Sequence, residues 1–101
     1  MSSKREKQIL NNIVEILKTR FNPEKIILFG SRAKKEEKSR SDFDIALNEK
    51  KPSIGEIRKL KREIEQVSGL YKVDVIFLKS VDKDFKNIVL KTGRIIYDKR
   101  K

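Results

Sequence analysis

Hydrophobic residues follow helical spacing in some segments and strand spacing in others, and this pattern predicts the secondary structure. Near the start, apolar residues recur every three or four positions, as on one face of a helix: Ile9, Ile13, Ile16 and Leu17. Asn22-Pro23 is expected to end this helix. The four apolar residues 26–29 then predict a buried strand.

The second half of the chain again alternates between helix and strand. Pro52-Ser53 begins a helix whose apolar stripe runs to a stop at Gly69, and residues 71–78 predict an apolar strand. A last helix stopped by Gly93 is predicted from Val81, Phe85, Ile88 and Val89. Residues 95–97 predict a short edge strand. We therefore expect an α/β (α+β) fold with a small mixed sheet and helices packed mainly on one side.

Gly30-Ser31 follows the first predicted strand directly, where it would turn the chain into a short helix over residues 31–33. The beginning of a helix presents free N–H groups and partial positive charge to an anion. Gly30 lets the backbone approach a phosphate closely, and the Ser31 hydroxyl can donate to a phosphate oxygen or cap the helix. The Gly-Ser pair therefore predicts a phosphate-binding turn, in which Ser31 binds and is not a nucleophile.

A carboxylate pair on the next predicted strand forms a candidate metal site. Ten residues separate the Gly-Ser pair from the strand 42–47, where Asp42, Asp44 and Ala46 share one face and the larger apolar residues share the other. Carboxylates at this spacing stand about 7 Å apart at Cα, so both can reach two divalent ions about 4 Å apart. Hard oxygen ligands favour Mg²⁺ or Mn²⁺.

Asp74 is a third candidate ligand, because it is the only charged residue between Lys72 and Lys79. An aspartate in the middle of a buried strand is costly unless it is paired, hydrogen-bonded or metal-bound. We therefore expect Asp42 and Asp44 to lie beside Asp74.

The order of these motifs, Gly-Ser, ten residues, Asp-x-Asp and a strand with a third Asp, resembles the DNA polymerase β-like nucleotidyltransferase superfamily. Within it, the chain is similar to the minimal nucleotidyltransferases of bacteria and archaea over nearly its whole length. The segment 92–98 is like the family's usual ending. The chain departs from the family's pattern at Lys35. Lys34 corresponds to a basic residue of the family's motif, and in many members a Gly follows that residue.

The resemblance implies a role for each motif residue. The nucleotide-binding positions correspond to Gly30, Ser31 and Arg32, and the metal-binding and catalytic positions to Asp42, Asp44 and Asp74. The turn would hold the β and γ phosphates of ATP, and Arg32 would pair with the triphosphate or stay solvated. The aspartates would ligate two Mg²⁺ ions, with Mn²⁺ as a substitute, and Asp74 would ligate the catalytic metal. Asp74 could also accept the proton of the attacking hydroxyl.

The resemblance also implies a partner. Minimal nucleotidyltransferases are commonly encoded beside a helical HEPN-domain protein, and in characterised pairs they are antitoxins that add AMP to a tyrosine of the HEPN toxin. This chain would then be a Mg²⁺-dependent antitoxin in a hetero-oligomer with its target. Two alternatives are a binding-only antitoxin that holds the partner by surface contact and a small-molecule nucleotidyltransferase completed by a separate acceptor-binding subunit.

Length and composition limit the number of domains, the chemistry and the location that the sequence allows. A chain of 101 residues predicts a single domain, 1–101, with little material beyond the catalytic scaffold, so another chain would bind the acceptor. The absence of Cys and His excludes disulfides, structural zinc and His-based acid–base catalysis. Neither a signal peptide nor a membrane-spanning apolar run is found, so we expect a cytoplasmic protein.

The net charge of +11 raises the question of nucleic-acid binding. Basic residues are scattered along the chain and mixed with Glu, however, which disfavours direct binding to nucleic acid. The phenylalanines also fall at apolar-patterned positions, which predicts core residues and not a base-stacking platform: Phe29, Phe43, Phe77 and Phe85.

Overall fold

The computed structural model describes residues 4–30, 43–69 and 71–101. Helices and strands follow in the predicted order: α1 Lys4–Phe21, β1 Lys25–Phe29, β2 Phe43–Leu47, α2 Ile54–Ser68, β3 Val73–Phe77, a 3₁₀ turn Leu78–Ser80, α3 Lys83–Thr92 and β4 Arg94–Asp98. The strand predicted over 71–78 is thus shorter, at Val73–Phe77. The short helix predicted over 31–33 lies outside the described residues.

The four strands form one mixed sheet in the order β3-β2-β1-β4. β1 is antiparallel to both β2 and β4, whereas β2 and β3 are parallel and connected through α2. β4 lies at one edge of the sheet, which confirms the edge strand predicted over 95–97. β3 lies at the opposite edge and pairs with β2.

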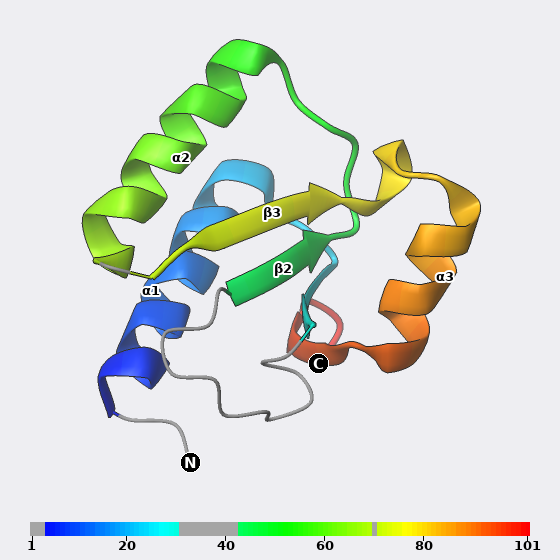
Figure 1. The fold of residues 1–101 in the computed structure, drawn as a ribbon, viewed down its shortest axis with the longest axis horizontal. Helices are drawn as coiled ribbons and strands as arrows, with labels where there is room; N and C mark the ends of the chain where they lie inside the picture. Colours follow the sequence, from blue (N-terminus) through cyan, green and yellow to red (C-terminus); the bar gives the residue numbers. More distant parts are fainter. Residues whose placement is uncertain (1–3, 31–42, 70) are drawn as a thin grey trace.

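α1 and α2 cover one face of the sheet. Ile13 and Leu17 of α1 and Leu60 of α2 are buried there against alternate residues of the strands. Residues of β2 on this face are Phe43, Ile45 and Leu47, as the alternation in the sequence predicts. Figure 1 shows α1 behind the strands and α2 along the β3 edge.

α3 covers part of the opposite face, where Val89 packs with Ile27, Ala46 and Leu78. Helices therefore lie mainly on one side, with α3 on the other (Figure 1). The helix predicted to stop at Gly93 is present, but Ile88, one of the apolar residues that predicted it, is 58% exposed. The face of α3 toward the sheet is instead formed around Val89 and Phe85.

Local sequence signals set the ends of α2 and α3. The Ser53 hydroxyl accepts a hydrogen bond from the N–H of Glu56, and the Asp82 carboxylate accepts one from the N–H of Phe85. Gly69 ends α2 with φ of 64°, a left-handed conformation that favours glycine. Within the three described ranges, the helices are all too short or too polar to cross a lipid bilayer.

Candidate active site

Two predicted site residues, Asp44 and Asp74, occupy paired positions on neighbouring strands. β2 and β3 are parallel, and Asp44 is the register partner of Asp74. Both side chains lie on the α3 face, since Ala46 and Ile76, two residues further on, pack in the cluster around α3. Paired strands run about 4.8 Å apart. The two carboxylates therefore stand side by side on one face of the sheet.

Gly30 brings the end of β1 against the first of these carboxylates. Phe29, the last residue of β1, is the register partner of Asp44, so Gly30 leaves the sheet directly beside it. Gly30 has φ of 76°, and a Cβ at this position would stand 2.5 Å from Oδ2 of Asp44. A side chain would therefore collide with the carboxylate, and only glycine lets the backbone pass so close.

The expectation that Asp74 lies within a buried strand was wrong. Asp74 is exposed, because β3 is an edge strand and α3 covers the sheet further along. Asp44, on the inner strand β2, is half-buried. The exposed carboxylate can therefore be approached from outside the protein, while Asp44 is held inside the site.

The other predicted site residues, Ser31, Arg32 and Asp42, lie outside the described residues. In the part of the chain that is described, no group of three or more His, Cys, Asp or Glu residues is placed to hold a metal ion. Asp44 and Asp74 supply two carboxylates in adjacent register. Carboxylate oxygens are the ligands of hard divalent cations, so this pair fits a Mg²⁺ or Mn²⁺ site to which a third carboxylate is added.

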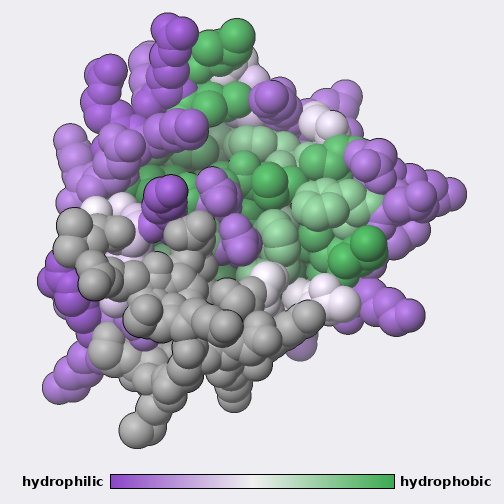
Figure 2. All heavy atoms as spheres, in the orientation of Figure 1, coloured by the Kyte–Doolittle hydropathy of each residue, from purple (hydrophilic) through white to green (hydrophobic). Residues whose placement is uncertain are grey.

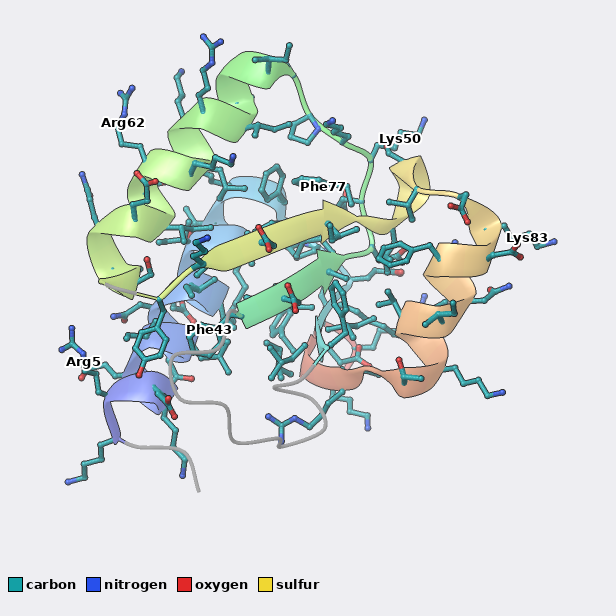
Figure 3. All side chains as sticks on the ribbon, in the orientation of Figure 1. Arg5, Phe43, Lys50, Arg62, Phe77 and Lys83 are labelled. Carbon is teal, nitrogen blue, oxygen red and sulfur yellow. The ribbon has the colours of Figure 1, made fainter. Side chains whose placement is uncertain are left out.

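A hollow of about 680 Å³ runs along β3 and includes both carboxylates. Its lining comes from both sides of the sheet, because β3 is an edge strand and the hollow passes around it. On the side of α2 it is lined by Ile57, Leu60 and Ile64, with Lys61 and Glu65. Labelled basic side chains such as Arg62 on α2 and Lys83 on α3 point away from the sheet (Figure 3).

On the side of α3, aromatic residues that the sequence placed in the core line the hollow next to the carboxylates. Phe29 and Phe85 are half-buried, and their ring centroids lie 6.1 Å apart in an edge-to-face arrangement. A sequence signal existed for Phe29, which immediately precedes the Gly-Ser turn. No local signal places Phe85, because its position depends on how α3 docks. Phe43 and Phe77 are core residues, as predicted.

Comparison with known proteins gives a consistent result. The family described as "Polymerase beta, Nucleotidyltransferase" matches residues 11–101. Two proteins of Methanocaldococcus jannaschii are similar in sequence: "Putative protein adenylyltransferase MJ1379" is 37% identical over 82 residues, covering 78% of this chain and 81% of the relative. "Putative protein adenylyltransferase MJ1217" is 32% identical over 80 residues, with the same coverage.

Solved structures share the fold at lower sequence identity. A crystal structure described as a toxin–antitoxin with AMP-PNP superimposes with a TM-score of 0.75 at 22% identity, covering 89% of this chain and 73% of that one. A structure described as the toxin–antitoxin MntA-HepT gives 0.70 at 20% identity, covering 93% and 74%. The mixed sheet and its helices therefore have the polymerase β-like nucleotidyltransferase fold.

Proposed function

This chain belongs to the polymerase β nucleotidyltransferase family, and we propose that it transfers AMP from ATP to a hydroxyl group of a partner protein. The observation that carries the proposal is the register of Asp44 and Asp74 beside the glycine turn at Gly30. The names of the two archaeal relatives support a protein as acceptor. The structural neighbour with AMP-PNP, an analogue of ATP, supports ATP as donor.

The triphosphate would be held by the turn after β1. Gly30 brings the backbone to the edge of the site, and Ser31 and Arg32, which follow it, would bind the β and γ phosphates. Backbone N–H groups and a guanidinium both favour phosphate oxygens. In this arrangement the α-phosphate would lie beside Asp44.

Asp42, Asp44 and Asp74 would hold two Mg²⁺ ions. When bound, these ions would lower the pKa of the attacking hydroxyl and stabilise the charge on the α-phosphate and on pyrophosphate. The chain's own contribution is to fix the carboxylates, and the pairing of Asp44 with Asp74 in the sheet does this on a rigid scaffold.

In the transfer step, the acceptor oxygen forms a bond to the α-phosphorus, and the bond from this phosphorus to the bridging oxygen of the β-phosphate breaks. Pyrophosphate leaves with the electron pair of that bond. The proton of the acceptor hydroxyl passes to the carboxylate of Asp74, which is exposed and thus accessible to a side chain of another protein.

The acceptor that we propose is a tyrosine of a HEPN-domain toxin, which the modification would silence. The toxin–antitoxin neighbours, one of them described as MntA-HepT, support a partner of this kind. The chain itself would act as a single-domain antitoxin, 1–101, in a hetero-oligomer with this toxin.

Intact-mass analysis of the HEPN protein encoded beside this chain tests the proposal. Incubation with ATP and Mg²⁺ should add AMP-sized increments to the partner. Asp44→Asn and Asp74→Asn should each slow this modification by about 100-fold or more, because loss of a metal ligand should cost at least as much as the loss of a residue that only supports a ligand, about 10- to 100-fold. Asp84→Asn, an exposed aspartate on α3, is the matched control and should leave the rate unchanged.

A stable complex without any added mass in the wild-type reaction would contradict the transferase. It would indicate the binding-only antitoxin instead. Modification of a metabolite but of no protein would indicate a small-molecule nucleotidyltransferase.

A further inference from the structure

A half-buried apolar surface adjoins the two carboxylates on the α3 face. It consists of Phe29 at the end of β1, Ile76 on β3 and Phe85 in the first turn of α3, and we call these three residues the apolar floor. Figure 2 shows hydrophobic surface over β3 and toward α3, bordered by hydrophilic side chains. All three line the same hollow as Asp44 and Asp74.

Packing on the buried core, contact between the two rings and the cap of α3 fix the apolar floor in place. All three side chains pack on the buried cluster of Ile27, Ala46, Leu78 and Val89. The rings of Phe29 and Phe85 meet edge to face, an arrangement that aromatic pairs prefer. The N–H of Phe85 donates to the cap residue Asp82 at 2.9 Å, which fixes the turn that carries the ring. Half-buried rings fixed in this way can bind another ring with little loss of side-chain freedom.

One member of the apolar floor, Ile76, lies on the side of the carboxylates away from the Gly30 turn, whereas Phe29 is level with Asp44. β1 is antiparallel to β2, so Gly30 extends past Asp44 toward the beginning of β2. Ile76 lies two residues after Asp74 in the opposite direction, and it is the register partner of Ala46. Along β2 and β3 the order is therefore the Gly30 turn, the two carboxylates and Ile76, with Phe29 beside Asp44.

This order, together with the geometry of phosphoryl transfer, identifies what the floor would bind. The attacking and leaving oxygens stand roughly in line on opposite sides of the phosphorus. With pyrophosphate at the Gly30 turn, the attacking hydroxyl would approach from the side of Ile76, where the apolar floor extends beyond the carboxylates. We propose that the apolar floor receives the aromatic ring of the acceptor tyrosine and thereby selects tyrosine over serine or threonine. This inference rests on the AMP transfer proposed above.

The proposal gives Phe85 a role in acceptor specificity. The tyrosine ring would lie on Ile76 and against Phe85, with its hydroxyl directed toward Asp74, whereas a serine or threonine would leave this surface uncovered. Loss of one aromatic contact corresponds to a change of about 3- to 10-fold.

The test compares acceptors and variants in the same transfer assay. The acceptor is the HEPN partner with its modified residue mapped by mass spectrometry, together with a version in which that tyrosine is replaced by serine. Phe85→Leu should lower kcat/KM for the tyrosine acceptor by about 3- to 10-fold, with the KM for ATP and the rate on the serine acceptor unchanged. Phe85→Tyr, which keeps the ring, should retain the preference for tyrosine.

Ile88→Ala is the control variant, because Ile88 lies on the same helix, is 58% exposed and is absent from the lining of the hollow. It should leave both acceptors unaffected, and thermal unfolding should show that every variant is folded. A higher KM for ATP in Phe85→Leu with an unchanged preference for tyrosine would overturn the inference and assign the floor to the nucleobase.

The failure of this inference differs from the failure of the proposed function. Transfer to tyrosine that Phe85→Leu leaves unchanged overturns the inference alone. Transfer to a mapped serine or threonine overturns the inference and the tyrosine acceptor, but it leaves AMP transfer to a partner protein in place. A wild-type protein that modifies no protein acceptor overturns both.

Discussion

At the scale of single residues, Gly30 is under two constraints at once, and both predict that Gly30→Ala is harmful. Its φ of 76° costs a residue with a side chain about 1–2 kcal/mol, and its Cβ would meet Oδ2 of Asp44 at 2.5 Å. The carboxylate must shift to make room, and a displacement near 1 Å can cost about 100-fold in rate. We expect lower stability by about 1–2 kcal/mol in urea unfolding and transfer slowed by about 100-fold.

Gly55→Ala is the matched control, since it makes the same chemical change elsewhere. Gly55 lies in the first turn of α2, where the nearest heavy atom to an added Cβ is Oγ of Ser53 at 4.0 Å. Alanine favours helix over glycine by up to about 1 kcal/mol, so this variant should be as stable as the wild type or more stable. Equal losses of stability and transfer rate in the two variants would show that the effect of Gly30→Ala does not come from contact with Asp44.

At the scale of elements, the beginning of α3 decides how firmly Phe85 is held beside the carboxylates. Asp82 accepts the N–H of Phe85 at 2.9 Å, and loss of such a cap costs about 1 kcal/mol. Asp82→Ala should therefore lower Tm by about 4–8 °C in a chain of this size. Asp84→Ala removes a negative charge from the same turn without removing the cap. If Asp84→Ala lowers Tm as much as Asp82→Ala does, the lost negative charge and not the lost cap explains the effect.

The elements were predictable from sequence because their signals are local. The stop at Gly69 and the start at Ser53 follow from the conformation and hydrogen bonds of a few neighbouring residues. The strand order is not local, and it is the strand order that leaves Asp74 exposed at an edge. The pairing of Asp44 with Asp74 was expected from the motif, whereas the place of Phe85 depends on the docking of α3 against the sheet.

At the scale of the whole molecule, the charge balance makes the protein sensitive to acid. The chain has 26 Lys and Arg against 15 Asp and Glu, so protonation of the carboxyl groups leaves the cations uncompensated. Repulsion among like charges destabilises a folded chain, and salt screens it. Ion pairs that connect distant parts of the sequence oppose this repulsion only while their carboxylates remain ionised.

The pair between Glu24 and Arg100 shows this dependence, because it connects the residue before β1 with the end of the chain. Arg100 Nη2 donates to Glu24 at 2.8 Å, and Asn48 donates at 3.3 Å. The hydrogen bond and charge of Arg100, aided by Asn48 and Lys79, hold the pKa of Glu24 below its ordinary value of 4.5. The ionised carboxylate therefore stabilises the fold above pH 4.5, and this contribution is lost as the pH falls through the lowered pKa.

A double-mutant cycle of Glu24→Gln and Arg100→Gln, measured by urea unfolding, isolates this contribution. The coupling between the two residues should be favourable at pH 7, begin to decline below pH 4.5 and disappear once Glu24 is protonated in the folded state. High salt should also reduce it at pH 7, because the pair is exposed, with side chains 75% and 45% accessible. A coupling that stays constant from pH 7 to pH 3 would mean that the contact is maintained by packing and not by charge.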